Sequence, residues 1–114
     1  MAARRGEIWR ISLDPVAGHE QAGDRPALVI SDDRINASAA GLVIVVPLTR
    51  TDRTIPSHVE INPPEGGVRE RSFAMCEQVR AVSVERLRGA AWGPPLSPAL
   101  LSEVERRLRL LIGL

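Results

Sequence analysis

The chain contains no lysine and no tyrosine, and its 114 residues include one cysteine, one phenylalanine and two tryptophans. The single cysteine, Cys76, excludes a disulfide within one chain. No charged leader followed by a long apolar run opens the sequence, so we expect a cytoplasmic protein that does not enter a membrane. The scarcity of aromatic side chains leaves little material for stacking on nucleic-acid bases.

The charge composition is nearly balanced, with a net charge of +1. A value this small excludes a strong general attraction to nucleic acids, so any such binding must come from local clusters of charge. All 15 basic residues are arginine, whose planar guanidinium favours bidentate contacts with phosphate. A genome rich in guanine and cytosine would also replace lysine by arginine, and composition does not separate the two explanations.

The length predicts one compact domain spanning residues 1–114. A chain of 114 residues with 44% hydrophobic content can bury one core but hardly two. The sequence contains no internal repeat, low-complexity tract or linker that would divide it. We therefore expect a single folding unit.

Short strands dominate the predicted secondary structure. Alternating or continuous apolar runs predict strands at residues 7–13, 27–30, 41–48, 58–61 and 72–82. Turn signals separate them, including Asp14-Pro15 and Asn62-Pro63-Pro64. The regular spacing of these strands predicts a mainly β protein, a small and strongly bent sheet or barrel.

The end of the chain predicts a helix. Ser97 followed by Pro98 is a typical helix start, and Gly113 is a typical stop. Between them an apolar stripe recurs at helical spacing, formed by Leu100, Leu101, Val104, Leu108, Leu111 and Ile112. This stripe must lie against the sheet or against another copy of the chain. We expect two shorter helical turns as well, one capped near Asp32-Asp33 and one over residues 84–88.

Polar side chains gather at the ends of the predicted strands. Glu20 and Arg25 lie five residues apart in a polar loop between two strands, and Thr49 follows the apolar run that ends at Leu48. Along residues 72–82, an alternating face of small and polar side chains could form the floor of a groove; its members are Ser72, Ala74, Cys76, Gln78 and Arg80. A solvated outer face is the competing interpretation. Glu77 interrupts the apolar face, so a twist or bulge is expected there.

These motifs resemble those of the MazF/PemK toxins. The resemblance is carried by residues 5–9, 13–15, 20–31, 47–49 and 77–82, and it covers roughly residues 5 to 89. It implies an SH3-like β-barrel with a C-terminal helix, a homodimer, and an endoribonuclease that cleaves single-stranded RNA without a metal or other cofactor. It also implies a cognate MazE-like antitoxin whose flexible tail blocks the RNA groove.

The chemistry of metal-free RNA cleavage assigns roles to three residues. The reaction needs a base for the 2′-hydroxyl proton, a donor for the leaving oxygen, and positive charge beside the phosphorus. Arg25 suits electrostatic stabilisation, Thr49 offers a hydroxyl to the same phosphate, and Glu20 would act as base or orient Arg25. The resemblance implies the same set as catalytic residues. The expected RNA-binding residues are Gln21, Ser31, Arg50, Ser72, Gln78 and Arg80.

Each of these residues also has a purely structural interpretation. Arg25-Pro26 could be a strand-entry turn with Arg25 paired to Asp24 or Glu20, and Thr49 could be an ordinary strand-end residue. Cys76 is interpreted as a buried small hydrophobe that is dispensable for activity.

The two histidines suggest other chemistry. His19 and His58 raise the alternative of a two-imidazole ribonuclease, which we disfavour because His58 is expected to face solvent. His58-Val59-Glu60 lacks the third and fourth ligands of a zinc site, so no metal site is expected.

Two other functions remain open. A toxin of the same fold could inhibit a protein target such as DNA gyrase without catalysis, because fold does not determine function. A catalytically silent module that binds RNA or antitoxin is the third possibility.

Apolar surface on the C-terminal helix and on residues 41–48 exceeds what so short a chain can cover, which favours a two-fold dimer.

Overall fold

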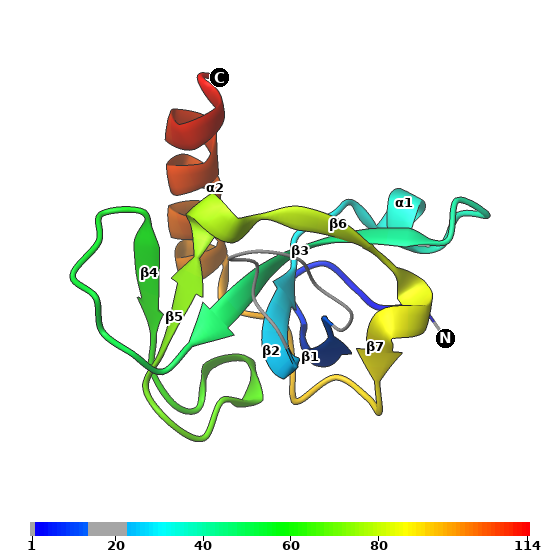
Figure 1. Ribbon diagram of the computed structural model, residues 1–114, viewed down its shortest axis with the longest axis horizontal. Helices are drawn as coiled ribbons and strands as arrows, with labels where there is room; N and C mark the ends of the chain where they lie inside the picture. Colours follow the sequence, from blue (N-terminus) through cyan, green and yellow to red (C-terminus); the bar gives the residue numbers. More distant parts are fainter. Residues whose placement is uncertain (1, 14–22) are drawn as a thin grey trace.

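Antiparallel strands and one long helix make up the computed structural model, which describes residues 2–13 and 23–114. The strands are β1 (Ile8–Ser12), β2 (Asp24–Val29), β3 (Leu42–Thr49), β4 (His58–Ile61), β5 (Ser72–Met75), β6 (Arg80–Ser83) and β7 (Leu87–Arg88). The helices are α1 (Asp33–Asn36) and α2 (Pro98–Ile112), and the 3-10 turns are η1 (Glu65–Gly67), η2 (Cys76–Gln78) and η3 (Val84–Arg86). Figure 1 shows the curled sheet with α2 standing at one side.

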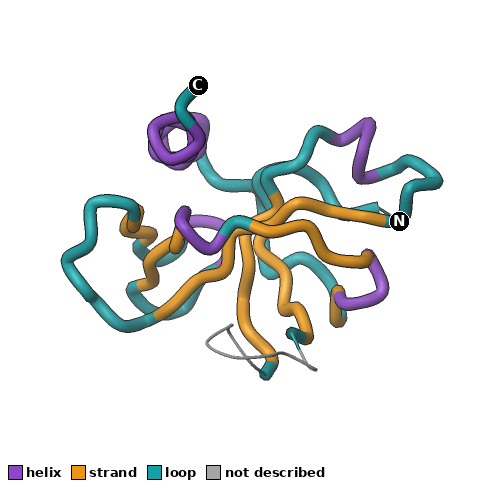
Figure 2. The backbone as a smooth tube through the Cα atoms, turned by 45° about the horizontal axis from the view of Figure 1, so that its top comes forward, coloured by secondary structure: helices purple, strands orange, loops and turns teal. Residues whose placement is uncertain are grey.

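Strand β3 organises the sheet. The strand order is β4-β5-β3-β2-β1-β7, and β6 also pairs with β3. Along its length β3 pairs first with β6, then with β2 from Val45 to Pro47, and finally with β5 at Leu48 and Thr49. Strand β2 pairs with one edge of β3, while β6 and β5 pair with the two ends of the other edge. The sheet therefore bends around β3, as the fanned strands in Figure 2 show. The predicted mainly β, strongly bent architecture is confirmed.

The bent sheet buries two groups of apolar side chains. One contains Ile11, Leu13, Ala27, Val29, Val43, Val45 and Val82, and the other contains Ile8, Leu28, Val46, Leu48, Val59, Ile61, Val104 and Leu108. Successive residues of a strand point to opposite faces. Neighbours on β2 and β3 therefore enter different groups, which explains why the sequence shows continuous apolar runs there.

Helix α2 begins and ends as its sequence predicts. The Ser97 hydroxyl accepts a hydrogen bond from the Leu100 backbone N–H, and Gly113 ends the helix with a φ of 84°. Val104 and Leu108 are buried against the sheet. The last turn extends beyond the barrel, where Leu111 and Ile112 are 48% and 61% exposed. The predicted stripe is thus covered by the sheet only along its first three turns.

The prediction of one strand over residues 72–82 is wrong. Turn η2 separates β5 from β6, and the chain uses it to pass from β4 and β5 to the other end of β3. The expected interruption at Glu77 lies within this turn. Ser72 through Met75 are all buried whereas Gln78 is exposed, so the alternating polar groove floor does not exist.

The two short helical turns are present. Asp32 caps α1, and its Oδ1 accepts from the Arg34 backbone N–H at 2.8 Å. Hydrogen bonds from Arg34 lower the pKa of Asp32 to about 2. The turn expected over residues 84–88 is η3 followed directly by β7, which pairs with β1.

His58 does not face solvent, contrary to prediction. Its side chain is 3% exposed, and its Nε2 lies 2.9 Å from Glu77 Oε2. Ser57 donates to the other carboxylate oxygen at 2.6 Å. Burial opposes ionisation of Glu77, but these hydrogen bonds outweigh it and hold the pKa of the carboxyl below its ordinary value. This carboxylate therefore ties turn η2 to strand β4.

Replacing Glu77 by glutamine should lower the free energy of unfolding at neutral pH by about 1.5 kcal/mol, the usual scale of a hydrogen bond to a charged group. The folded pKa of Glu77 is lowered, so its ionised form adds stability above the unfolded value of 4.5 and loses that contribution as pH falls through the folded pKa. Urea unfolding of E77Q and wild type at pH 7 and pH 3 measures the difference. The difference should shrink in acid, and the exposed Glu85→Gln variant should show neither effect.

Candidate active site

The register of β2 and β3 brings two predicted catalytic residues to one place. Ala27 pairs with Pro47 and Leu28 with Val46. The pairing ends at Ala27 and Pro47, so Arg25 and Thr49 both lie just beyond it at the same end of β2 and β3. Although they are 24 positions apart in sequence, both line one cavity.

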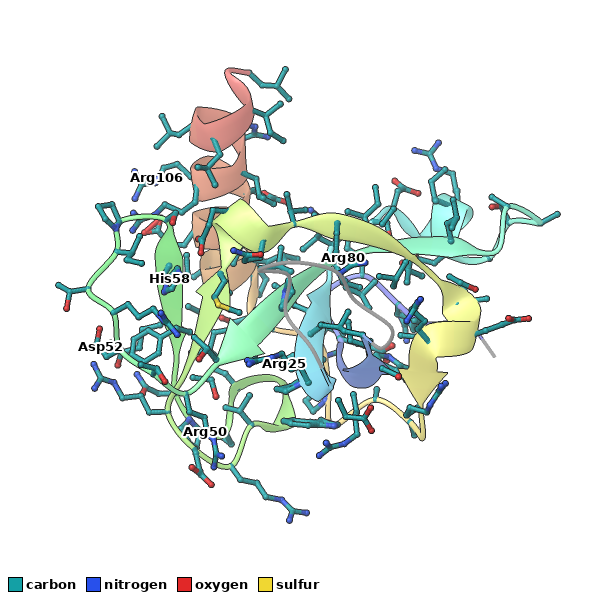
Figure 3. The ribbon with its side chains drawn as sticks, viewed as in Figure 1. Arg25, Arg50, Asp52, His58, Arg80 and Arg106 are labelled. Carbon is teal, nitrogen blue, oxygen red and sulfur yellow. The ribbon has the colours of Figure 1, made fainter. Side chains whose placement is uncertain are left out.

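A cavity of about 720 Å³ opens at this end of the sheet, and we call it the arginine pocket. It is lined by Arg10, Asp24, Arg25, Pro26, Leu48, Thr49, Arg50, Gly67, Arg69, Glu70, Ser72 and Trp92. Figure 3 places Arg25 centrally beside the ends of β2 and β3, with Arg50 toward one margin. Four arginines face two carboxylates in the lining, so the pocket carries net positive charge.

Arg25 brings a buried nitrogen without a hydrogen-bond partner among the described residues to the pocket. The residue is partly buried, and this nitrogen is its Nε. A buried donor of a charged group normally has a partner, because leaving it unpaired costs free energy. The arrangement thus suits an anionic ligand that would accept from Arg25.

Thr49 presents a nearly buried hydroxyl at the same end of the sheet. The residue is 9% exposed, and its Oγ1 accepts from the Thr51 backbone N–H at 3.2 Å. Accepting this bond orients the oxygen and leaves the hydroxyl hydrogen available for donation. Arg25 and Thr49 thus bring N–H and O–H donors to the same cavity.

Two further predicted RNA-binding residues line the pocket. Arg50 Nη1 lies 3.0 and 2.9 Å from the two carboxylate oxygens of Glu70, and both side chains are well exposed. Exposed ion pairs contribute little stability, so Arg50 can exchange Glu70 for a phosphate. The Ser72 hydroxyl donates to the Glu70 carbonyl at 2.9 Å, which fixes the loop that carries Glu70.

Three predicted RNA-binding residues lie outside the pocket lining. Ser31 is buried; its hydroxyl donates to Asn36 and accepts from the Ile44 backbone N–H at 2.9 Å, so it joins α1 to β3. Gln78 is exposed on η2, and Arg80 is partly buried at the start of β6. The predicted Glu20 and Gln21, together with His19, lie outside the described residues.

The sequence interpretation missed several residues of the pocket. Arg10, Arg69, Glu70 and Trp92 all line it. The Arg10 guanidinium lies over the Trp92 ring, 5.9 Å from its centroid. The alternation around β1 does place Arg10 on the outer face, but Arg69 and Trp92 lie in loops where no local periodicity predicts their position.

Other predicted features can be located in the described part of the chain. Cys76 is buried, as interpreted, and burial raises the pKa of its thiol to about 11. Within residues 2–13 and 23–114, no three histidine, cysteine, aspartate or glutamate side chains gather as metal ligands would. In the same residues, no helix has both the length and the apolar character needed to cross a bilayer.

The fold and the pocket together define a small, bent antiparallel β protein with a positively charged cavity beside the strand ends. The family model described as PemK-like, MazF-like toxin of type II toxin-antitoxin system matches residues 4–112. The chain belongs to this toxin family. The resemblance carried by the sequence motifs is thereby confirmed.

Named relatives and solved structures agree with this assignment. The chain is 36% identical over 116 residues to endoribonuclease MazF9 of Mycobacterium tuberculosis, covering 97% of each chain. It superposes with a TM-score of 0.87 on MazF from Deinococcus radiodurans, at 26% identity over 100% of this chain and 99% of that one. An endoribonuclease from a mycobacterial species, solved in complex with its cognate antitoxin, matches with a TM-score of 0.81 at 26% identity, over 99% and 97%. These structures confirm the predicted fold class.

Proposed function

We propose that residues 1–114 act as one toxin domain that cleaves single-stranded RNA without a metal ion. The observation that carries the proposal is the buried, unpartnered Nε of Arg25 in a positively charged pocket that Thr49 shares. The endoribonuclease activity named for MazF9 supports the reaction class. A cytoplasmic location would give the protein access to messenger RNA.

The proposed reaction is an in-line displacement at phosphorus. The ribose 2′-oxygen bonds to phosphorus, the bond to the 5′-oxygen breaks, and the products are a 2′,3′-cyclic phosphate and a 5′-hydroxyl. Arg25 and Thr49 donate to the phosphate oxygens as negative charge builds up, in a pocket where such donors act strongly. Glu20 is proposed to accept the 2′-hydroxyl proton or to orient Arg25. The proton that the 5′-oxygen requires comes from a donor in the pocket or from water.

The remaining contacts would extend along the RNA strand. Arg50 and Ser72 line the pocket and are proposed to hold the nucleotides next to the scissile phosphate. Gln21, Gln78 and Arg80 are proposed to contact nucleotides farther along the strand, where the Gln78 amide can both donate and accept. Ser31, which is buried beside α1 and β3, completes the proposed set.

Two protein partners belong to the proposal. The antitoxin bound to the mycobacterial endoribonuclease supports a cognate MazE-like antitoxin for this chain. A homodimer is supported by apolar side chains that the described chain leaves exposed on β3 and α2, namely Leu42, Ile44, Leu110, Leu111 and Ile112.

A cleavage assay in excess chelator separates the candidate functions. A long single-stranded RNA incubated with the purified protein and EDTA should be cut into fragments with 2′,3′-cyclic phosphate ends. RNA binding without cleavage would instead support the silent binding module. Absence of both, together with inhibition of DNA gyrase, would support a toxin with a protein target.

Replacing Thr49 by valine should reduce cleavage by about a hundredfold, the usual effect of losing one donor to a developing oxyanion. Valine keeps the branched shape and removes the hydroxyl. Thr49→Ser retains the hydroxyl, so its cleavage rate should stay within about tenfold of the wild-type rate. Single-turnover rates of both variants test the role, and equal rates would remove Thr49 from the chemistry.

A further inference from the structure

We propose that Trp92 and Arg10 form a nucleobase subsite in the arginine pocket, which receives an unpaired purine next to the scissile phosphate. The inference rests on the proposed RNA cleavage and names a determinant of substrate choice for it.

Trp92 is the aromatic residue available for stacking in the pocket. It lines the cavity and is 37% exposed. Phe73 is only 5% exposed. Trp9 packs against the core, and its indole N–H donates to Glu7 Oε1 at 3.1 Å. Among the three aromatic side chains, Trp92 alone combines exposure with a place in the pocket lining.

The Trp92 backbone is held rigidly beside the pocket. Its N–H donates to the Ile8 carbonyl at 2.9 Å. On the other side, Gly67 approaches so closely that a Cβ there would lie 2.3 Å from the Trp92 carbonyl oxygen. A ring whose backbone is already fixed loses little conformational entropy when a ligand stacks on it.

Arg10 lies over the Trp92 ring and carries directional N–H donors. Its guanidinium lies 5.9 Å from the Trp92 centroid, and no hydrogen bond or ion pair joins it to another described residue. Arginine pairs in bidentate fashion with the O6 and N7 acceptors of guanine, and adenine offers N7 as well. A purine stacked on Trp92 could therefore accept from Arg10 along the same edge.

The subsite lies next to the reacting phosphate. Arg10 pairs across the sheet with Pro26, the residue after Arg25. These three side chains and Trp92 line the same cavity as Thr49. A nucleotide with its phosphate on Arg25 can therefore place a neighbouring base against Trp92. Purines are preferred over pyrimidines because they offer a larger stacking face and the N7 acceptor.

Binding of an uncleavable RNA tests the subsite separately from cleavage. The probe is a single-stranded 12-mer with 2′-O-methyl riboses and randomised bases, and a pyrimidine-only 12-mer serves for comparison. In a Trp9→Phe protein, in which Trp92 is the only tryptophan, the randomised probe should quench fluorescence. In a Trp92→Phe protein, which retains only Trp9, the fluorescence should stay unchanged.

Affinities complete the test. Trp92→Leu should weaken binding of the randomised probe about tenfold or more, as loss of one stacked base predicts. Trp92→Phe should bind within about threefold of wild type, because it keeps a stacking face. Arg10→Gln should reduce the preference for the randomised over the pyrimidine-only probe. Thermal unfolding of each variant confirms that it is folded.

The outcomes distinguish this inference from the proposed function. Unchanged Trp92 fluorescence with wild-type affinity in Trp92→Leu would overturn the subsite even if natural RNA is cut. Quenching and loss of affinity as expected, with natural RNA left intact, would support the subsite and overturn the nuclease. Equal affinity of wild type for both probes would overturn the purine preference.

Discussion

Replacing Arg25 by alanine should reduce RNA cleavage at least about a thousandfold, the upper range for losing one preorganised donor to a charged transition state. Arg25 would supply a full positive charge and several N–H donors. Removing it should therefore lower the cleavage rate more than removing the neutral hydroxyl of Thr49. Arg25→Lys keeps the positive charge but lacks the planar guanidinium with its several N–H donors. This variant should therefore recover only part of the cleavage rate. Single-turnover cleavage of a long RNA in EDTA measures all three proteins.

The stability of the Arg25 variant provides a second and independent test. Arg25 Nε has no hydrogen-bond partner among the described residues, so alanine removes no hydrogen bond at that atom. The melting temperature of the variant should therefore stay the same or rise, because residues kept for function often lower the stability of a fold. Arg53→Ala, an exposed arginine outside the pocket lining, should change cleavage by no more than about twofold. Wild-type cleavage by R25A would exclude Arg25 from the mechanism.

Replacing Gly67 by alanine should destabilise the fold by about 3 kcal/mol or more, through a left-handed backbone and overpacking together. Gly67 has a φ of 86°, and an added Cβ would lie 2.3 Å from the Trp92 carbonyl oxygen and 2.8 Å from the Gly93 nitrogen. These neighbours are backbone atoms, so no side chain can rotate away. Urea unfolding measures the loss, which is a large fraction of the stability of a small domain.

Gly89 offers the matched control for this substitution. Its φ is 70°, but nothing lies within 4 Å of the position that a Cβ would occupy. Gly89→Ala should therefore show only the backbone cost, about 1–2 kcal/mol. Equal losses in the two variants would show that the contact between Gly67 and the Trp92–Gly93 segment contributes nothing. The Gly67 variant should also bind RNA more weakly, because the contact that positions Trp92 is disturbed.

Local sequence patterns predicted much of the fold because their causes are local. Period-two alternation marks β1 and β4, and the Ser97 cap with Gly113 marks both ends of α2. The motif that contains Arg25 and the strand that ends at Thr49 likewise point to the proposed catalytic pair. Each of these signals depends on residues close together in sequence.

The errors arose where distant segments decide the structure. Residues 72–82 form two strands because the chain must move from one end of β3 to the other. His58 is buried because Glu77, far along the chain, lies against it. No pattern within a short window encodes such contacts.

The sequence by itself determined the strand and helix types, the toxin family and two candidate catalytic residues, because periodicity, caps and motif spacing are written along the chain. Only the tertiary structure decided the composition of the arginine pocket. Arg10, Arg69 and Trp92 reach it from separate segments, and close packing of Gly67 against Trp92 and Gly93 fixes one wall. Such packing depends on three-dimensional fit between backbones, which residue order alone does not reveal.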